Sequence, residues 1–212
     1  MFRTLCLVSA LLLTGCSTAY YAAMEKVGVH KRDILVDRVE EARDAQMVSQ
    51  EEFKDALDEL SQLIKFHGGD LQTRYEALSA QYEESKKAAA DVSSRISKVE
   101  TVAFDLFTEW ENELSQYQSK QLRADSKKKL LETKRQFDAL VRVMRRAESK
   151  MPPVLRVLND NVLYLKHNLN AKAVGAIQGE FGMLQQDVNS LVAEMNRAIA
   201  ESNQFIATIN QQ

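Results

Sequence analysis

The stretch VGAIQGEFGMLQQDVNSLVAEMNRAIAESNQFIATI, residues 174–209, carries the clearest repeat in the chain. Apolar residues recur in it at alternating steps of three and four, as they do at the core positions of a heptad. These positions are Val174, Ile177, Phe181, Leu184, Val188, Leu191, Met195, Ile199, Phe205 or Ile206, and Ile209, with Ser202 filling one slot. The spacing predicts a long helix that packs against other helices through one continuous seam.

Three earlier segments show the same spacing. Their seams run over residues 53–64, 75–110 and 130–169. Ser49 and Glu52 resemble a capping box, which indicates a helix start or a local kink before the first seam. In the third segment, Pro152-Pro153 removes two backbone donors, so we expect this helix to kink there or a new helix to begin.

Three stretches interrupt the apolar rhythm, and each contains residues suited to end one helix and cap the next. They are HGGD at 67–70, QLRADSKKK at 121–129 and HNLN at 167–170. In the second stretch, Asp125 or Ser126 is the expected cap, and a hairpin would be centred on Ala124. Four segments of similar length favour antiparallel partners in a bundle.

The composition supports the same fold class. Of 212 residues, 45% are hydrophobic, whereas 7 are glycine and 2 are proline, too few turn formers for a sheet of many strands. We therefore predict an all-α fold: an elongated antiparallel helical bundle with coiled-coil packing, about four long helical segments, and a kink at Pro152-Pro153. Segments of roughly 40 to 50 residues would give a rod of about 60 to 75 Å.

The first sixteen residues predict export and lipid attachment. Arg3 is followed by an apolar run, residues 5–13, which is too short to span a bilayer and has the layout of a secretory signal peptide. The motif Leu13-Thr14-Gly15-Cys16 resembles the bacterial lipobox, in which the cysteine is lipidated and the signal is cut just before it. The alternatives are an ordinary cleaved signal with a chance cysteine and an N-terminal anchor that is left uncut.

Lipid attachment at Cys16 sets the expected domain boundaries. We expect a signal peptide over 1–15, a lipidated N-terminus and short tether over 16–19, and a single helical coiled-coil domain over 20–212. Ser17 stands where retention signals of the inner membrane usually carry aspartate, so the resemblance implies the outer membrane. Tyr20 and Tyr21 would lie either at the headgroup layer or against the base of the domain.

Charge predicts how the second and third segments fold together. Residues 100–113 contain five acids and no lysine or arginine, and the facing stretch is rich in basic residues: Lys134, Arg135, Arg142, Arg145 and Arg146. We expect ion pairs across the hairpin, although each exposed pair contributes only about 0.2 to 1 kcal/mol. The alternative is a patch for lipopolysaccharide, phospholipid or peptidoglycan. Lys127, Lys128 and Lys129 have fewer acids opposite, and they are the candidate patch for an anionic ligand.

Gly175, Gly179 and Gly182 form a stripe beside the seam of the fourth segment. Each glycine costs about 1 kcal/mol relative to alanine in a helix interior. The stripe therefore predicts close approach of a second helix backbone, as at other interfaces of small residues. The alternative is a flexible helix start. If the stripe packs closely, Gly179→Leu should disrupt packing or assembly.

The sequence contains no familiar catalytic pattern: no G-x-S-x-G, no H-E-x-x-H and no G-x-x-x-x-G-K. Cys6 and Cys16 both lie at the N-terminus, so the rest of the chain has no thiol for a disulfide or a metal site. His67 and Asp70 are better explained as helix caps than as metal ligands, and Trp110 is expected in the core. The net charge of -2 gives no global preference for nucleic acid. Because the catalytic and metal-binding patterns are missing, we also expect no enzyme, metal, cofactor or small-molecule substrate.

The whole chain is similar to one bacterial family. The lipobox, the coiled-coil middle and the stretch NDNVLYLKHNLNAKAVGAIQGE, residues 159–180, resemble the domain of unknown function 2959 family. The resemblance covers nearly the whole chain. It implies no activity, and it transfers no catalytic or binding residue.

These patterns favour an outer-membrane-anchored periplasmic lipoprotein that acts as a structural adaptor or scaffold through its helical surfaces. Its expected partners are the membrane, through acyl chains on Cys16, and envelope proteins or a second copy of the chain. The alternative is a module that binds lipid or lipopolysaccharide, or that associates with the membrane. Co-purifying lipid would favour the alternative.

Overall fold

Four long helices form the fold. The computed structural model describes residues 30–65 and 71–211, which contain no strand. The helices are α2 (Lys31–Ile64), α3 (Leu71–Glu113), α4 (Lys120–His167) and α5 (Ala171–Asn210), with a short 3₁₀ helix, η2 (Leu114–Gln116), after α3. The predicted all-α class is confirmed. The predicted signal peptide, the tether and the HGGD break at 67–70 lie outside the described residues.

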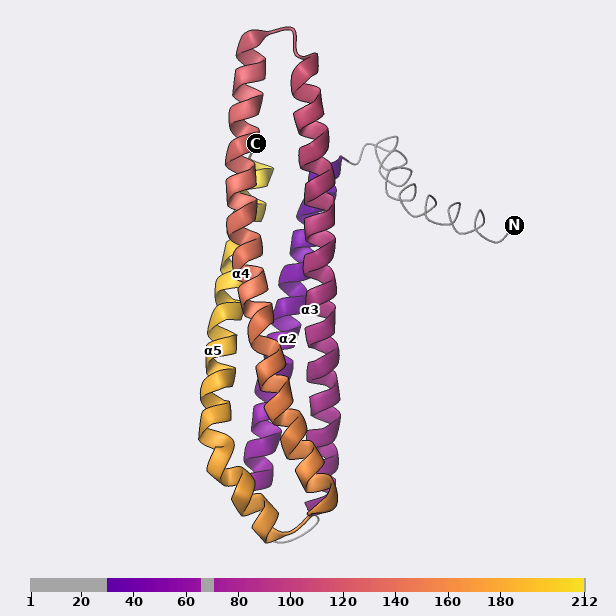
Figure 1. Cartoon of the computed structure of the whole chain (residues 1–212), viewed down its shortest axis with the longest axis vertical. Helices are drawn as coiled ribbons and strands as arrows, with labels where there is room; N and C mark the ends of the chain where they lie inside the picture. The colour runs from indigo at the N-terminus through magenta and orange to yellow at the C-terminus, as the bar shows by residue number, and fades with distance from the viewer. Residues whose placement is uncertain (1–29, 66–70, 212) are drawn as a thin grey trace, which may run out of the picture.

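The helices run up and down around one core. Helix α2 packs against α3 and α5, and α4 packs against the same two helices, so antiparallel neighbours form a ring (Figure 1). Helix α4 contains 48 residues, which corresponds to a length of about 72 Å. The molecule is therefore an elongated bundle, as the four seams predicted.

The predicted seam residues supply the core. In α5 the buried positions include Ile177, Leu184, Val188, Leu191, Met195, Phe205 and Ile209. Phe137 of α4 contacts Phe107 of α3 and Phe205 of α5, with ring centroids 5.5 Å and 6.0 Å apart. Burial of a side chain of this size stabilises the fold by about 1.5 to 3 kcal/mol. This aromatic group joins three of the four helices.

The connection between α3 and α4 differs from the prediction. Helix α4 begins at Lys120, and the Oγ of its N-cap residue, Ser119, accepts a hydrogen bond from the backbone N–H of Leu122 at 3.3 Å. The predicted caps, Asp125 and Ser126, therefore lie inside the helix. The polar stretch 121–129 lacks a seam because, among the described helices, α2 and α5 end before they reach it, and it does not mark a break.

Two other predicted irregularities lie within continuous helices. Helix α4 runs through Pro152 and Pro153, so a new helix does not begin there. Both prolines are exposed. Because proline has no backbone N–H, the carbonyls one turn earlier lose their helical partners, and on this exposed side of the helix water can bond them instead. In Figure 1 the lower part of α4 runs obliquely to its upper part. The capping box predicted at Ser49 is wrong, because Ser49 is buried in the middle of α2.

The last predicted break is confirmed. Helix α4 ends at His167, and Asn170 caps α5. The Oδ1 of Asn170 accepts hydrogen bonds from the backbone N–H groups of Lys172 and Ala173, both at 3.1 Å. A side chain of this type satisfies donors that the first turn of a helix leaves unpaired.

Candidate interaction surface at the α3–α4 hairpin end

The α3–α4 hairpin extends beyond the ends of the other two helices (Figure 1). At the level where α2 begins, Lys31 Nζ lies 2.6 Å from Glu109 Oε1 of α3. At the same level, Ile209 near the end of α5 lines a cleft together with Thr133 of α4. Past this level α3 and α4 continue as a pair, so no other described helix covers the faces that would meet α2 and α5.

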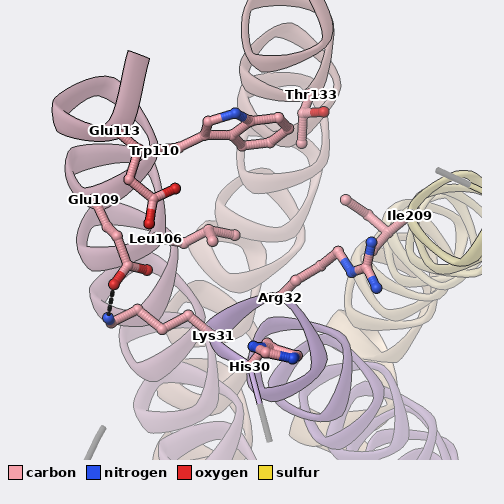
Figure 2. Close-up of a pocket in the computed structure, with 9 residues that line it drawn as sticks. All are labelled: His30, Lys31, Arg32, Leu106, Glu109, Trp110, Glu113, Thr133 and Ile209. Atoms are coloured by element: carbon pink, nitrogen blue, oxygen red, sulfur yellow. Dashed lines mark hydrogen bonds and ion pairs between the residues drawn. The ribbon is translucent and has the colours of Figure 1, made fainter. Parts of the chain in front are cut away.

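A cleft of about 540 Å³ opens where four helices become two (Figure 2). All four helices contribute to its wall, which consists of His30, Lys31, Arg32, Leu106, Glu109, Trp110, Glu113, Thr133 and Ile209. In Figure 2 the ring of Trp110 reaches from α3 toward Thr133, and the side chain of Arg32 points toward Ile209. The cleft thus combines apolar surface with charged groups of both signs.

Trp110 divides this cleft from a second one. Its Nε1 donates a hydrogen bond to Ser126 Oγ at 2.8 Å, so the polar group of the indole is satisfied. The second cleft, of about 320 Å³, is lined by Arg32, Trp110, Tyr117, Leu122, Asp125, Ser126 and Lys129. Trp110 is only partly buried, so its expected place in the core is only partly right. In the sequence, Trp110 is the last residue of the seam over residues 75–110, and this end position is the signal that it lies at the edge of the core.

The hairpin tip, defined here as residues 117–131, is basic and partly apolar. Its five cations are all exposed: Lys120, Arg123, Lys127, Lys128 and Lys129. No acid of residues 30–65 or 71–211 forms an ion pair with them. The single acid of the tip, Asp125, accepts hydrogen bonds from Gln121 at 3.2 Å. The predicted lysine patch is therefore an exposed helical surface in the structure.

Ion pairs join α3 to α4 as the charge pattern predicted. Lys134 pairs with Glu111, and Arg145 pairs with Glu100. Hydrogen bonding to Glu100 outweighs the effect of burial and raises the pKa of Arg145 above its ordinary value. Of the other predicted bases, Arg146 pairs with Glu194 of α5, at 3.2 Å. Three of the five predicted bases thus pair within the bundle, whereas Arg135 and Arg142 form no ion pair with a described residue.

A further ion pair links α2 to α3. Glu41 lies 2.6 Å from Arg38 Nη1 and 2.7 Å from Arg95 Nη1. Burial disfavours the charged carboxylate, but the hydrogen bonds from the two arginines outweigh this effect and lower the pKa of Glu41. This pair helps to fix the relative orientation of the two helices.

The glycine stripe faces open space. A Cβ atom built on Gly175, Gly179 or Gly182 has no described atom within 4 Å, outside its own helix backbone. The close approach that the sequence predicted is therefore not made by any described helix of this chain. Met183 beside the stripe is 65% exposed. Packing of another chain on this stripe stays a prediction.

Within the part of the chain that the structure describes, no helix is both long enough and apolar enough to cross a bilayer. The same residues contain no group of three or more histidine, cysteine, aspartate or glutamate side chains that could hold a metal ion.

Comparison with known families agrees with the helical organisation. The sequence profile of a protein family of unknown function, DUF2959, matches residues 20–209. The chain belongs to the DUF2959 family. The resemblance noted in the sequence is thereby confirmed, and the matched region includes α2, α3, α4 and nearly all of α5. No curated protein matches the chain. Membership of DUF2959 assigns no activity, so a functional proposal depends on the surfaces described above.

Proposed function

We propose that this DUF2959 protein is an outer-membrane-anchored periplasmic lipoprotein that acts as a structural adaptor or scaffold and has no catalytic role. The lipobox at Cys16 supports the anchor, because a cysteine that follows an apolar signal of this length is the acceptor of lipid in exported bacterial proteins. Several acyl chains would hold the protein stably on the membrane. The bundle would then present helical surfaces to other envelope components.

The cleft at the hairpin end is the observation that most directly supports an adaptor role. Along most of the rod, four helices bury one another's seams, but at this end Leu106 and Trp110 line a cleft that opens to solvent. An amphipathic helix from a partner would cover part of the surface that α2 and α5 cover along the rest of the rod. Recognition of a helix in an apolar groove is a recurring mode of protein binding. The partner we expect is thus an envelope protein with an exposed amphipathic helix.

The direction of the chain supports a partner close to the membrane. Helix α2 begins at the same end of the rod as the cleft, and residues 17–30 connect it to Cys16. Fourteen residues span at most about 50 Å even when fully extended. An anchored Cys16 would therefore keep the cleft within that distance of the membrane.

Photo-cross-linking in cells tests this proposal. A photoreactive amino acid at Glu113, which is exposed and lines the cleft, should capture a discrete envelope protein. The matched control carries the same amino acid at Lys150, an exposed position in the middle of α4. We expect the envelope protein to be captured from position 113 and not from position 150. We also expect this capture to be lost when Cys16→Ala is added. Equal capture from both positions would contradict a specific docking site.

A specific observation favours the alternative function, lipid binding. The second cleft places Arg32 and Lys129 beside the apolar surfaces of Trp110 and Leu122, which suits a molecule with an anionic head and an apolar chain. Mass spectrometry of lipids that co-purify with the protein distinguishes the two functions. Lipid binding would be the favoured function if the wild type co-purifies with lipid in stoichiometric amount and with no protein partner, and if this lipid is lost in the double variant Arg32→Glu with Lys129→Glu.

A further inference from the structure

We propose that the hairpin tip, residues 117–131, rests on anionic phospholipid headgroups of the membrane that holds Cys16. The tip would act as a second, electrostatic contact that keeps the hairpin end of the rod directed toward the bilayer. This inference rests on the proposed lipid anchor at Cys16. It names an anionic lipid surface as the partner of the lysine patch.

The charge of the tip is complementary to such a surface. Five cations and one acid lie between residues 117 and 131, although the whole chain has a net charge of -2. Elsewhere on the hairpin, Lys134 and Arg145 are neutralised by acids of α3, whereas the cations of the tip are free of ion pairs with described residues. Basic residues near an anionic bilayer each contribute about 1 kcal/mol to binding, with a range of roughly one Debye length.

Apolar side chains at the tip match the interfacial layer of a bilayer. Leu122 is 58% exposed, Leu131 is 51% exposed and Tyr117 is 39% exposed. Tyrosine is enriched at the level of lipid headgroups, because its ring is apolar and its hydroxyl is polar. Exposed leucines interleaved with lysines on one short helical stretch are typical of surfaces that lie on membranes.

The position of the anchor makes the contact possible. Thr133 lies level with the start of α2, and α4 begins thirteen residues earlier, at Lys120. At 1.5 Å per residue, the tip therefore extends about 20 Å beyond the start of α2. The connection over residues 17–30 reaches at most about 50 Å. The tip thus projects from the same end as the anchored segment and lies within the reach of its tether.

Reconstitution of the full lipidated chain into vesicles tests the inference. A fluorophore on Gln118→Cys reports contact through quenching by a lipid that carries a headgroup quencher, and Lys150→Cys serves as the mid-rod control. The vesicles contain neutral lipid alone or neutral lipid with phosphatidylglycerol. We expect quenching at position 118 only with phosphatidylglycerol, and its loss when the salt rises from about 0.1 M to about 1 M, because the Debye length falls from about 10 Å to about 3 Å.

Charge reversal supplies the sharpest comparison. Lys127→Glu with Lys128→Glu should lower the contact equilibrium by at least about 25-fold, since the loss of each basic side chain alone lowers it about fivefold, while helical circular dichroism stays unchanged. The matched control, Lys150→Glu with Arg156→Glu, changes the net charge equally at exposed positions of mid-α4 and should leave quenching intact.

Two outcomes separate a failure of the inference from a failure of the anchor. If the protein floats with the vesicles but position 118 shows no quenching, the tip contact alone is overturned. Equal quenching at positions 118 and 150, or quenching at 118 that does not depend on phosphatidylglycerol, would also overturn the tip contact alone. Protein that does not float with vesicles of either composition would overturn the anchor and the tip contact together. A large loss of helicity in the lysine variant would also contradict the surface role of the patch.

Discussion

Replacement of Gln46 by methionine should stabilise the protein. Gln46 lies in the middle of α2 and is fully buried, and neither Oε1 nor Nε2 forms a hydrogen bond with a described residue. Burial of an amide without a partner costs about 1 to 3 kcal/mol in proteins. Methionine has a similar length and shape and carries no group that needs a partner.

The expected gain in the free energy of unfolding is therefore about 1 to 3 kcal/mol. For a chain of this size, each kcal/mol raises Tm by about 2 to 4 °C. Urea titration followed by circular dichroism measures the free energy, and a thermal scan measures Tm. A polar residue at a core position can fix the register of packed helices at the expense of stability.

Gln50, one turn further along α2, supplies a matched control. Its Nε2 donates hydrogen bonds to Asn196 Oδ1 at 2.9 Å and to the backbone carbonyl of Val192 at 3.3 Å, both on α5. Gln50→Met removes these bonds, so it should lower stability by about 0.5 to 1.5 kcal/mol. A loss of more than about 1 kcal/mol in Gln46→Met would show that its amide is satisfied in solution, and would refute the reasoning.

Three further predictions follow from the ion pairs and the glycine stripe. Because hydrogen bonds from two arginines lower the pKa of Glu41 from its ordinary value of 4.5, Glu41→Gln should destabilise the protein at neutral pH. The difference from the wild type should shrink as the pH falls below 4.5 and vanish below the lowered pKa, which urea titrations at several pH values measure. Gly179→Ala should raise stability by about 1 kcal/mol in a thermal scan, whereas reduced stability or a changed oligomer size would indicate that another chain packs there. A double-mutant cycle of Arg145→Gln and Glu100→Gln should give a coupling of about 0.2 to 1 kcal/mol, and a value above about 2 kcal/mol would contradict the exposed geometry of this pair.

The helical seams could be predicted from the sequence because their spacing reports burial directly. Most predicted heptad positions of α5 are buried, and Val174, Phe181 and Ile199 are half-buried. The Asn170 cap has a side chain that favours one local role. The position of the α3–α4 turn could not be predicted in the same way. Lys127 and its neighbours would interrupt the apolar spacing either as a loop or as a helix that no other helix covers. Which of these structures forms depends on the lengths of the other helices.

The candidate site illustrates the same limit. The lysine patch is visible in the sequence, but the clefts beside Trp110 depend on where α2 begins and where α5 ends. Those ends belong to segments far from Trp110 in the chain. No described helix of this chain approaches Gly179 and its stripe closely, since small residues permit close packing but do not require it.

The proposed function requires that Cys16 anchors a helical scaffold, which brings its surfaces to envelope partners. Cross-linking in cells, followed by affinity purification and mass spectrometry of proteins and lipids, tests it most directly when the intact chain is compared with Cys16→Ala. We expect one envelope protein to be recovered in stoichiometric amount with the intact chain and to be lost with the variant. Equal recovery of that protein with both chains, or bound lipid without any protein partner, would contradict it.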